Sequence, residues 1–281
     1  MVIPPQKLKG LFNEYGIWPS KSKGQNFLIN QNVLDKIVEA ADLKSTDYVL
    51  EIGPGFGILT EELIKKVKKV LSIELDKRLV YFLKQKFKHE TKLEVLLSDV
   101  LKIKNIELYK KLVGEKEDYK LVANLPYNIT GAVLRKFLTY EPKPAVIILL
   151  LQKEVAQRII AKPPKMSLLS LSVQYYGKPQ IIDYVSKESF YPKPEVDSAI
   201  IKIELKKDPI LNQINEKKFW QLAKIGFSSP RKQLQNNLVA GLKINKETIK
   251  IALKSVKLAP ECRPADLDLE QWISLSKNLV M

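Results

Sequence analysis

Asn124-Leu125-Pro126-Tyr127 follows a predicted strand and combines an amide, a proline and an aromatic ring. The exocyclic amine of a nucleic-acid base is a poor nucleophile, because its lone pair is delocalised into the ring. The Asn124 side-chain carbonyl and the main-chain carbonyl of Leu125 can each accept one amine N–H, while Tyr127 stacks on the base. Pro126 lacks an N–H and fixes its own φ, which helps hold these carbonyls toward a ligand. An ordinary strand-to-helix turn is the alternative, but the pattern favours methylation of an aromatic amine.

A glycine-rich loop from Glu51 to Gly57 follows another predicted strand and opens a helix. Gly53 and Gly55 allow a tight turn and the close approach of a ligand to the backbone. Glu74 ends the next strand, where its carboxylate can accept hydrogen bonds from both hydroxyls of a ribose. The spacing is G-x-G-x-G rather than the dinucleotide pattern G-x-G-x-x-G, which favours S-adenosylmethionine over NAD as the cofactor.

Three further side chains adjoin this predicted site. Asp99 follows the third strand, where it can accept a hydrogen bond from the cofactor's adenine amine or act as a turn residue. Glu51 either caps local backbone donors or contacts the amino-acid end of the cofactor. Phe190 offers a second stacking face for an extruded base, with core packing as the alternative. Methyl transfer depends mainly on positioning and needs no strong base, which agrees with the single histidine, His89.

The elements that must position these residues alternate between strand and helix. The first helix follows a cap at Asn30 and carries an apolar stripe that starts at Val33. The continuous apolar run at Ala145–Leu151 is typical of a buried parallel strand. We therefore expect a doubly wound, Rossmann-like α/β sheet. Its expected strands are Tyr48–Ile52, Val70–Glu74, Leu93–Leu97, Leu121–Asn124 and Ala145–Leu151.

The strand signals stop after Leu205, and a linker at 206–209 leads into helical sequence. We expect a methyltransferase domain at 1–205, with 1–20 as an N-terminal extension, and a small all-helical domain at 206–281 that contacts RNA or the ribosome. Its clearest helix carries a stripe from Ile249 to Val256. Pro230 suits the first turn of another helix.

The composition indicates a polyanionic partner. There are 47 basic and 31 acidic residues, for a net charge of +16, and only five of the basic residues are arginine. Lysines bind phosphate as point charges, so broad RNA binding is favoured over base reading. One cysteine and one histidine exclude a structural zinc site of the usual kind, and we expect no metal. Without a membrane span or secretory signal, we expect a cytoplasmic protein.

The sequence resembles the small-subunit ribosomal RNA adenine N6,N6-dimethyltransferases, which are class I methyltransferases. The resemblance covers about Lys21 to the C-terminus. It rests on six segments: Gly24-Gln25-Asn26-Phe27-Leu28, Glu51 to Gly57, Ile73-Glu74-Leu75-Asp76, Asn124 to Tyr127, Gln152-Lys153-Glu154-Val155, and Phe190 through Val196-Asp197-Ser198.

The resemblance implies dimethylation of two adjacent adenosines in the 3′-terminal hairpin of small-subunit rRNA, within an immature ribosomal subunit. The protein is expected to act as a monomer. The residues implied to contact the methyl donor are Asn26, Leu28, Gly53, Glu74, Asp99 and Asn124. For Asn26 and Leu28 the resemblance is the only basis.

Three segments depart from the family pattern. Ser98 stands where many members have glycine, Gly131-Ala132 replaces small polar residues, and Ser229-Pro230-Arg231-Lys232 replaces a more arginine-rich run. The last departure puts the RNA contacts of the helical domain in question.

Three other functions stay open. A large-subunit rRNA methyltransferase would share the chemistry, although such enzymes commonly carry isoleucine where Leu125 stands. A non-catalytic RNA-binding assembly or transcription factor would keep the fold, but the motifs here are intact. An NAD-dependent dehydrogenase is disfavoured by the glycine spacing.

Overall fold

A computed structural model describes residues 3–19, 25–114, 117–206 and 215–279. The chain divides into two compact units, one of residues 1–156 and 179–205, the other of 157–178 and 206–281. The second unit thus takes in the segment 157–178 in addition to the C-terminal part that the sequence predicts. Gly24 and residues 207–209 of the predicted linker lie outside the described residues.

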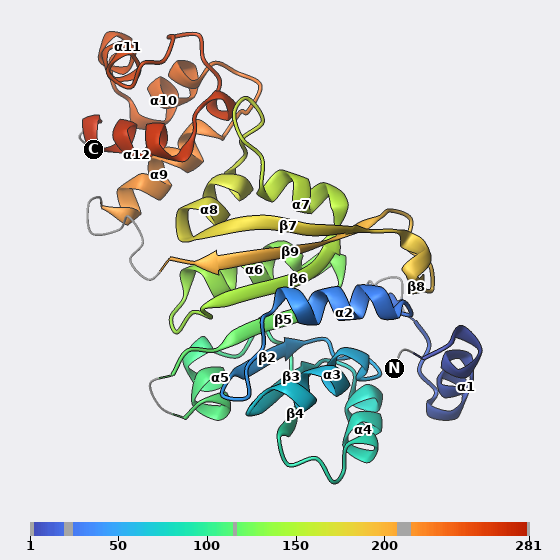
Figure 1. The fold of residues 1–281 in the computed structure, drawn as a ribbon. Helices are drawn as coiled ribbons and strands as arrows, with labels where there is room; N and C mark the ends of the chain where they lie inside the picture. Colours follow the sequence, from blue (N-terminus) through green and yellow to red (C-terminus); the bar gives the residue numbers. More distant parts are fainter. Residues whose placement is uncertain (1–2, 20–24, 115–116, 207–214, 280–281) are drawn as a thin grey trace. The chain divides into compact units, whose positions relative to one another are not determined.

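The first unit is built on a seven-stranded sheet (Figure 1). Strands β2 to β6 are parallel, and β9 runs antiparallel to β6. The predicted strands are present to within one residue at each end. In spatial order the strands are β4 (Leu93–Leu97), β3 (Lys69–Glu74), β2 (Tyr48–Ile52), β5 (Lys120–Asn124), β6 (Val146–Gln152), β9 (Ser198–Leu205) and β7 (Gly177–Val185).

The strand order reverses between β2 and β5. The chain builds β2, β3 and β4 outward in one direction, then returns to place β5 against the other side of β2. A ligand in an open α/β sheet binds at such a switch point, beyond the carboxyl ends of the strands. Gly53 follows β2 and Asn124 ends β5, so the two predicted motifs adjoin there.

Helices cover both faces of this sheet. Asn30 caps α2 by accepting the N–H of Asn32 and of Val33, as the sequence predicts. The apolar faces of α2 and α3 pack together on one side of the sheet, and α6 lies behind the sheet in Figure 1. The helices are α2 (Gln31–Ala40), α3 (Ile58–Lys66), α4 (Lys77–Lys86), α5 (Asn105–Leu112), η1 (Tyr127–Ile129), α6 (Thr130–Thr139) and α7 (Lys153–Ile159).

The predicted N-terminal extension contains helix α1 (Pro5–Tyr15), which ends at Gly16 in the left-handed conformation. Beyond it, β1 (Phe27–Leu28) pairs antiparallel with β8 (Phe190–Tyr191), which follows the short helix η2 (Lys187–Ser189). This pairing joins two of the motifs that carry the family resemblance, although more than 150 residues separate them.

The second unit is helical. Its described helices are α8 (Leu168–Tyr176), α9 (Glu216–Gly226), α10 (Leu234–Leu242), α11 (Lys246–Ser255), η4 (Pro264–Asp266) and α12 (Leu269–Asn278). Its core includes Tyr175, Phe219 and Trp272, which are all fully buried. Along the described parts of the chain, none of the helices has the length and apolar character needed to cross a membrane.

The prediction for Pro230 is wrong. Pro230 lies in the turn between α9 and α10, and α10 begins four residues later at Leu234. The Asn237 side chain of α10 donates to the carbonyls of Gly226 (2.6 Å) and Ser229 (3.0 Å). These bonds hold the turn in place, and a proline's fixed φ suits a turn as well as a helix start.

Candidate functional site

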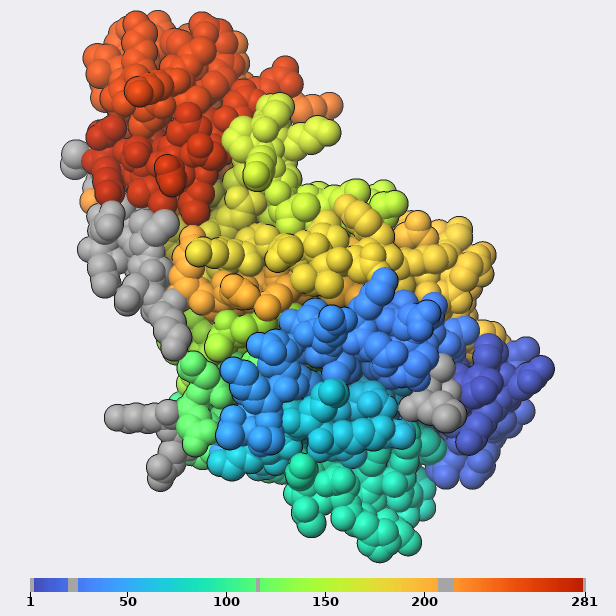
Figure 2. Space-filling view, in the orientation of Figure 1, coloured from blue at the N-terminus to red at the C-terminus, as the bar shows by residue number. Residues whose placement is uncertain are grey.

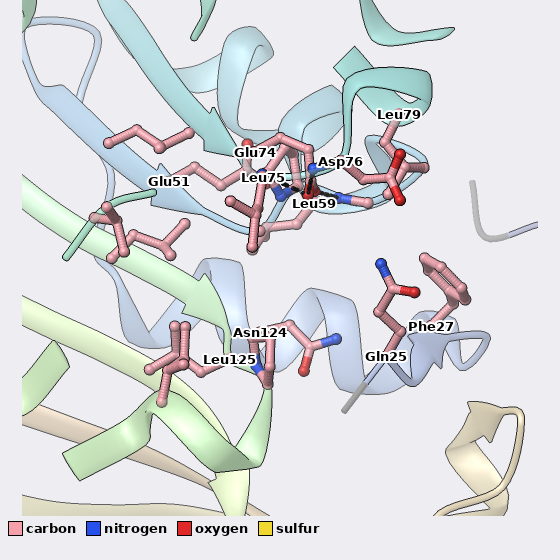
Figure 3. A pocket seen from close by; sticks show the side chains of 18 of the residues that line it. Gln25, Phe27, Glu51, Leu59, Glu74, Leu75, Asp76, Leu79, Asn124 and Leu125 are labelled. Carbon is pink, nitrogen blue, oxygen red and sulfur yellow. Dashed lines mark hydrogen bonds between the residues drawn. The ribbon is translucent and has the colours of Figure 1, made fainter. Parts of the chain in front are cut away.

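A cavity of about 270 Å³ opens at the switch point of the sheet. Figure 3 shows its two sides: Glu74 ends β3 and Leu75 follows it, while Asn124 ends β5 and Leu125 follows it. The cavity brings together every residue that the sequence predicts for the methyl donor. These lining residues are Asn26, Leu28, Gly53, Gly55, Glu74, Asp99 and Asn124.

The glycine loop meets the predicted chemical motif directly. Gly53, Gly55 and Gly57 have φ values of 69°, 56° and 73°, in the region that favours glycine. A Cβ on Gly53 would lie 3.8 Å from Cδ of Pro126 and 3.9 Å from the carbonyl oxygen of Asn124. A ligand lying on this loop is therefore within contact distance of the Asn124 to Tyr127 turn.

Glu74 is held by the backbone around it. One of its carboxylate oxygens accepts the N–H of Leu75 (2.8 Å) and of Asp76 (2.9 Å), and the other accepts the N–H of Gly55 (3.3 Å). Burial nevertheless raises the pKa of Glu74. A carboxylate has about four acceptor positions, so the fixed Glu74 still has capacity to bind a hydroxyl group.

An apolar slot lies beside Glu74. Leu75 (59% exposed) and Leu101 (37% exposed) line the cavity next to Val100. Asp99 stands at the edge of this slot and accepts the N–H of Leu101 at 2.9 Å, which is the turn role that the sequence also allows. The slot has the apolar walls and polar edge that an adenine ring requires. Sequence reasoning did not identify Leu75 or Leu101, although apolar residues one and two positions after the candidate carboxylates Glu74 and Asp99 could have indicated them.

Glu51 is only 1% exposed and lies at the base of the cavity. Its Oε2 accepts the hydroxyls of Thr60 (2.7 Å) and Ser72 (2.6 Å). Its Oε1 is buried and has no hydrogen-bond partner among the described residues. Burial raises the pKa of Glu51 from 4.5 to about 7. A buried carboxylate oxygen without a donor is costly, so this atom is suited to receive a cationic group of a ligand.

The Asn124 side chain has a defined orientation. Its Nδ2 donates to the main-chain carbonyl of Asn26 at 3.3 Å. Since only the amide nitrogen can donate, the side-chain oxygen is the atom that is left to accept from a substrate. The N–H of Leu125 donates to the carbonyl of Leu150, which extends the β5–β6 ladder into the motif.

Tyr127 is anchored at its hydroxyl. The hydroxyl lies 2.7 Å from Oγ of Ser198, at the start of β9. Burial raises the pKa of Tyr127. The ring is thus held at both ends, by the backbone after Pro126 and by Ser198.

Phe190 does not line the cavity. It is 3% exposed and packs in the core cluster that contains Leu28, Ile37 and Ile200. This placement is the core packing that the sequence left open as the alternative. A stacking role for Phe190 stays a prediction, and it would require the ring to leave this cluster.

Helix α1 supports the outer wall of the cavity. Phe27 and Phe56 line the wall, and their ring centroids lie 5.0 Å apart. Phe12 of α1 packs on both rings, at 5.6 and 5.7 Å. Phe27 in turn contacts the glycine loop, where a Cβ on Gly55 would lie 3.1 Å from the ring. Sequence reasoning missed this role because the aromatic residues are scattered along the chain.

Two of the departures from the family pattern lie in the first unit. Ser98 lines the cavity, and its N–H donates to the main-chain carbonyl of Glu74 at 2.9 Å. Gly131 is in open space, since a Cβ there would meet no atom within 4 Å. The helix α6 therefore does not require glycine at this position.

Comparison with known proteins identifies the family. Residues 20–280 match the family model described as ribosomal RNA adenine dimethylase. The ribosomal RNA small subunit methyltransferase A of Dehalococcoides mccartyi is 44% identical, over 94% of this chain and 89% of that protein. The protein of the same description from Bacillus mycoides is 36% identical, over 100% of this chain and 98% of that protein.

Solved structures agree with this assignment. A dimethyladenosine transferase from Plasmodium falciparum is 30% identical, with a TM-score of 0.71 over 89% of this chain and 95% of that one. The 23S rRNA methyltransferase ErmE is 26% identical, with a TM-score of 0.73 over 90% of this chain and 99% of that one. The family match over residues 20–280, together with the similarity to these relatives, shows that this chain belongs to the ribosomal RNA adenine dimethylase family.

Proposed function

We propose that this protein transfers methyl groups from S-adenosylmethionine to N6 of adenosines in small-subunit rRNA. The expected product is N6,N6-dimethyladenosine at two adjacent positions of the 3′-terminal hairpin. We place the reaction in the cytoplasm, on an immature small subunit, with the protein acting as a monomer. The observation that carries the proposal is the junction of the glycine loop with Asn124-Leu125-Pro126-Tyr127, where a donor and an amine acceptor would lie side by side.

The residues around the cavity fit the parts of this donor. Glu74 would accept the ribose hydroxyls, and Leu75 and Leu101 would hold the adenine with Asp99 at its edge. Glu51 Oε1 is buried and has no donor in the part of the chain that the structure describes, so it would accept the α-ammonium group. When bound, S-adenosylmethionine supplies an electrophilic methyl group.

The chain's own residues then act on the amine. In the first transfer, Asn124 Oδ1 and the main-chain carbonyl of Leu125 each accept one N–H of N6, which turns the nitrogen lone pair toward the methyl group. In the second transfer, one of these oxygens accepts the single N–H that remains. Tyr127 stacks on the base and keeps it in line. The amine proton held at Asn124 is lost to water after transfer, so no side-chain base is needed. Positioning supplies most of the acceleration in such a reaction.

The test is methyl transfer to defined acceptors. We expect the protein with labelled S-adenosylmethionine to label immature small subunits, and mass spectrometry of the 3′-end rRNA fragment to locate two dimethylated adenosines. Asn124→Ala should abolish transfer and keep RNA binding. Normal transfer by Asn124→Ala would contradict the proposed clamp.

Large-subunit rRNA is the second candidate, because ErmE shares the fold. The higher identity to small-subunit methyltransferases over nearly the whole chain favours the first. Naked large-subunit rRNA belongs in the same assay, and labelling of this RNA alone would replace the proposal with the alternative.

A further inference from the structure

A second hollow, of about 690 Å³, lies between helices α1 and α4. Both helices lie on the surface in Figure 2, α1 in dark blue and α4 in teal. The residues that line the hollow are Glu14, Tyr15, Lys77, Arg78, Tyr81 and Gln85. None of them takes part in the proposed chemistry.

Helix α4 presents an unusual outer face. Its inner face buries Leu79, Phe82 and Leu83, as an amphipathic helix should. Its outer face carries Lys77, Lys84 and Gln85 around Tyr81, which is 60% exposed. No acidic residue occurs within the helix. Packing of the fold therefore does not explain an aromatic ring at position 81.

A second exposed ring lies nearby. Trp18 is 63% exposed and is two residues from Gly16. The main-chain carbonyl of Gly16 accepts a hydrogen bond from the Arg78 guanidinium. Two residues span at most about 7 Å, so the Trp18 backbone lies within about 7 Å of Gly16, which the Arg78 side chain reaches from the first turn of α4. We call Trp18, Lys77, Tyr81 and Lys84 together the α1–α4 surface.

This surface borders the catalytic cavity. Asp76 and Leu79 of the first turn of α4 line the cavity, while Lys77 and Arg78 of the same turn line the hollow. Arg78 links the two by binding both oxygens of Asp76, at 2.8 and 3.0 Å, as well as the end of α1. A strand that enters the cavity has this surface directly beside it.

We propose that the α1–α4 surface binds unpaired nucleotides that flank the target adenosines. Trp18 and Tyr81 stack with bases, and Lys77 and Lys84 contact phosphates. Exposed aromatic rings set among cations are the usual platform for single-stranded nucleic acid. RNA fits better than a protein partner because α4 presents cations without carboxylates, and Glu14 is the single acidic residue among the described residues that line the hollow. This inference rests on the proposed function, since it assigns the path of that substrate.

The test uses the full chain and a 3′-terminal rRNA hairpin with single-stranded flanks. Stacking should quench the fluorescence of Trp18, and Trp18→Phe should remove that quenching, since Trp272 is fully buried and the Trp220 ring packs on Tyr175 and Tyr176. Tyr81→Ala should raise the KM for RNA about tenfold, without changing kcat or the Kd for S-adenosylmethionine. Tyr81→Phe should restore the KM, because phenylalanine keeps the stacking face.

The matched control is Tyr140→Ala, which removes a tyrosine of similar exposure (58%) at the end of α6. An RNA KM for Tyr81→Ala equal to that of Tyr140→Ala would overturn the inference. The inference would also be overturned if Tyr81→Ala bound the flanked hairpin as tightly as the wild type but methylated the ribosomal subunit more slowly. The occupant of the surface would then be a protein. If the wild-type chain transfers no methyl group but RNA still quenches Trp18, the proposed function fails while the RNA surface stands.

Discussion

Replacing Glu51 with glutamine should stabilise the protein and weaken its binding of S-adenosylmethionine. Burial raises the pKa of Glu51 from 4.5 to about 7. The ionised form is therefore disfavoured in the folded state. The penalty is absent below pH 4.5, where the carboxyl is protonated in both states, and grows until the pH exceeds 7. A pKa change of this size corresponds to about 3 kcal/mol above pH 7.

Glu51→Gln removes this penalty and keeps the shape of the side chain. We expect its free energy of unfolding to exceed that of the wild type by up to about 3 kcal/mol at pH 8, and by little at pH 5. Urea unfolding at the two pH values measures this difference. Glu39→Gln, at an exposed carboxylate of α2, is the matched control and should not change the free energy of unfolding at either pH.

Ligand binding should change in the opposite direction. The α-ammonium group of the donor would stabilise the ionised Glu51, so wild-type affinity should rise as the pH increases through 7. Removing a charge-assisted hydrogen bond costs about 1.5–3 kcal/mol, which corresponds to roughly 10- to 150-fold weaker binding. Calorimetry with S-adenosylmethionine at pH 6 and pH 8 measures the affinity of the wild type and of Glu51→Gln. Equal affinity of Glu51→Gln and wild type at pH 8, or lower stability of the variant there, would refute this reasoning.

Substitutions at three further positions test other parts of the structure. Phe12→Ala removes the ring that supports the aromatic wall. The Kd for S-adenosylmethionine, measured by calorimetry, should rise several-fold while the chain stays folded. An unchanged Kd would show that α1 does not support the site. Tyr127→Phe loses the hydrogen bond to Ser198 at a cost of about 1 kcal/mol, so kcat should fall by less than tenfold in the methylation assay, whereas Tyr127→Ala should lose nearly all activity. Gly226→Ala places a Cβ 2.4 Å from the Trp272 ring. This overpacking should lower the free energy of unfolding of the helical unit by about 1–3 kcal/mol, as measured by denaturant unfolding. Binding of S-adenosylmethionine in the first unit should not change.

Periodicity was sufficient to predict the five parallel strands β2 to β6, but it did not predict β7 at the edge of the sheet. The strands of the first unit are short apolar runs between turn residues, and their order places Gly53, Glu74 and Asn124 at one edge. Such polar residues at strand ends can be recognised locally, because the chain itself fixes their distance from the strand.

Other parts of the site depend on contacts between distant segments. The wall built by Phe12, Phe27 and Phe56 arises only when α1 packs against the glycine loop, and no local pattern encodes that contact. The burial of Phe190 follows from the pairing of β8 with β1. Pro230 was placed wrongly because proline suits both a turn and the start of a helix.

The orientation of Asn124 has a consequence for biosynthesis. Its partner Asn26 lies 98 residues earlier in the chain, and the partner of Tyr127 lies 71 residues later. Contacts of such long range form only after the intervening sheet has closed. A nascent chain has no anchored Tyr127 until Ser198 has left the ribosome, and domains fold as units during synthesis. The anchored Tyr127 therefore appears only when most of the first unit has been synthesised, and a chain that ends before Ser198 lacks this anchor for the base.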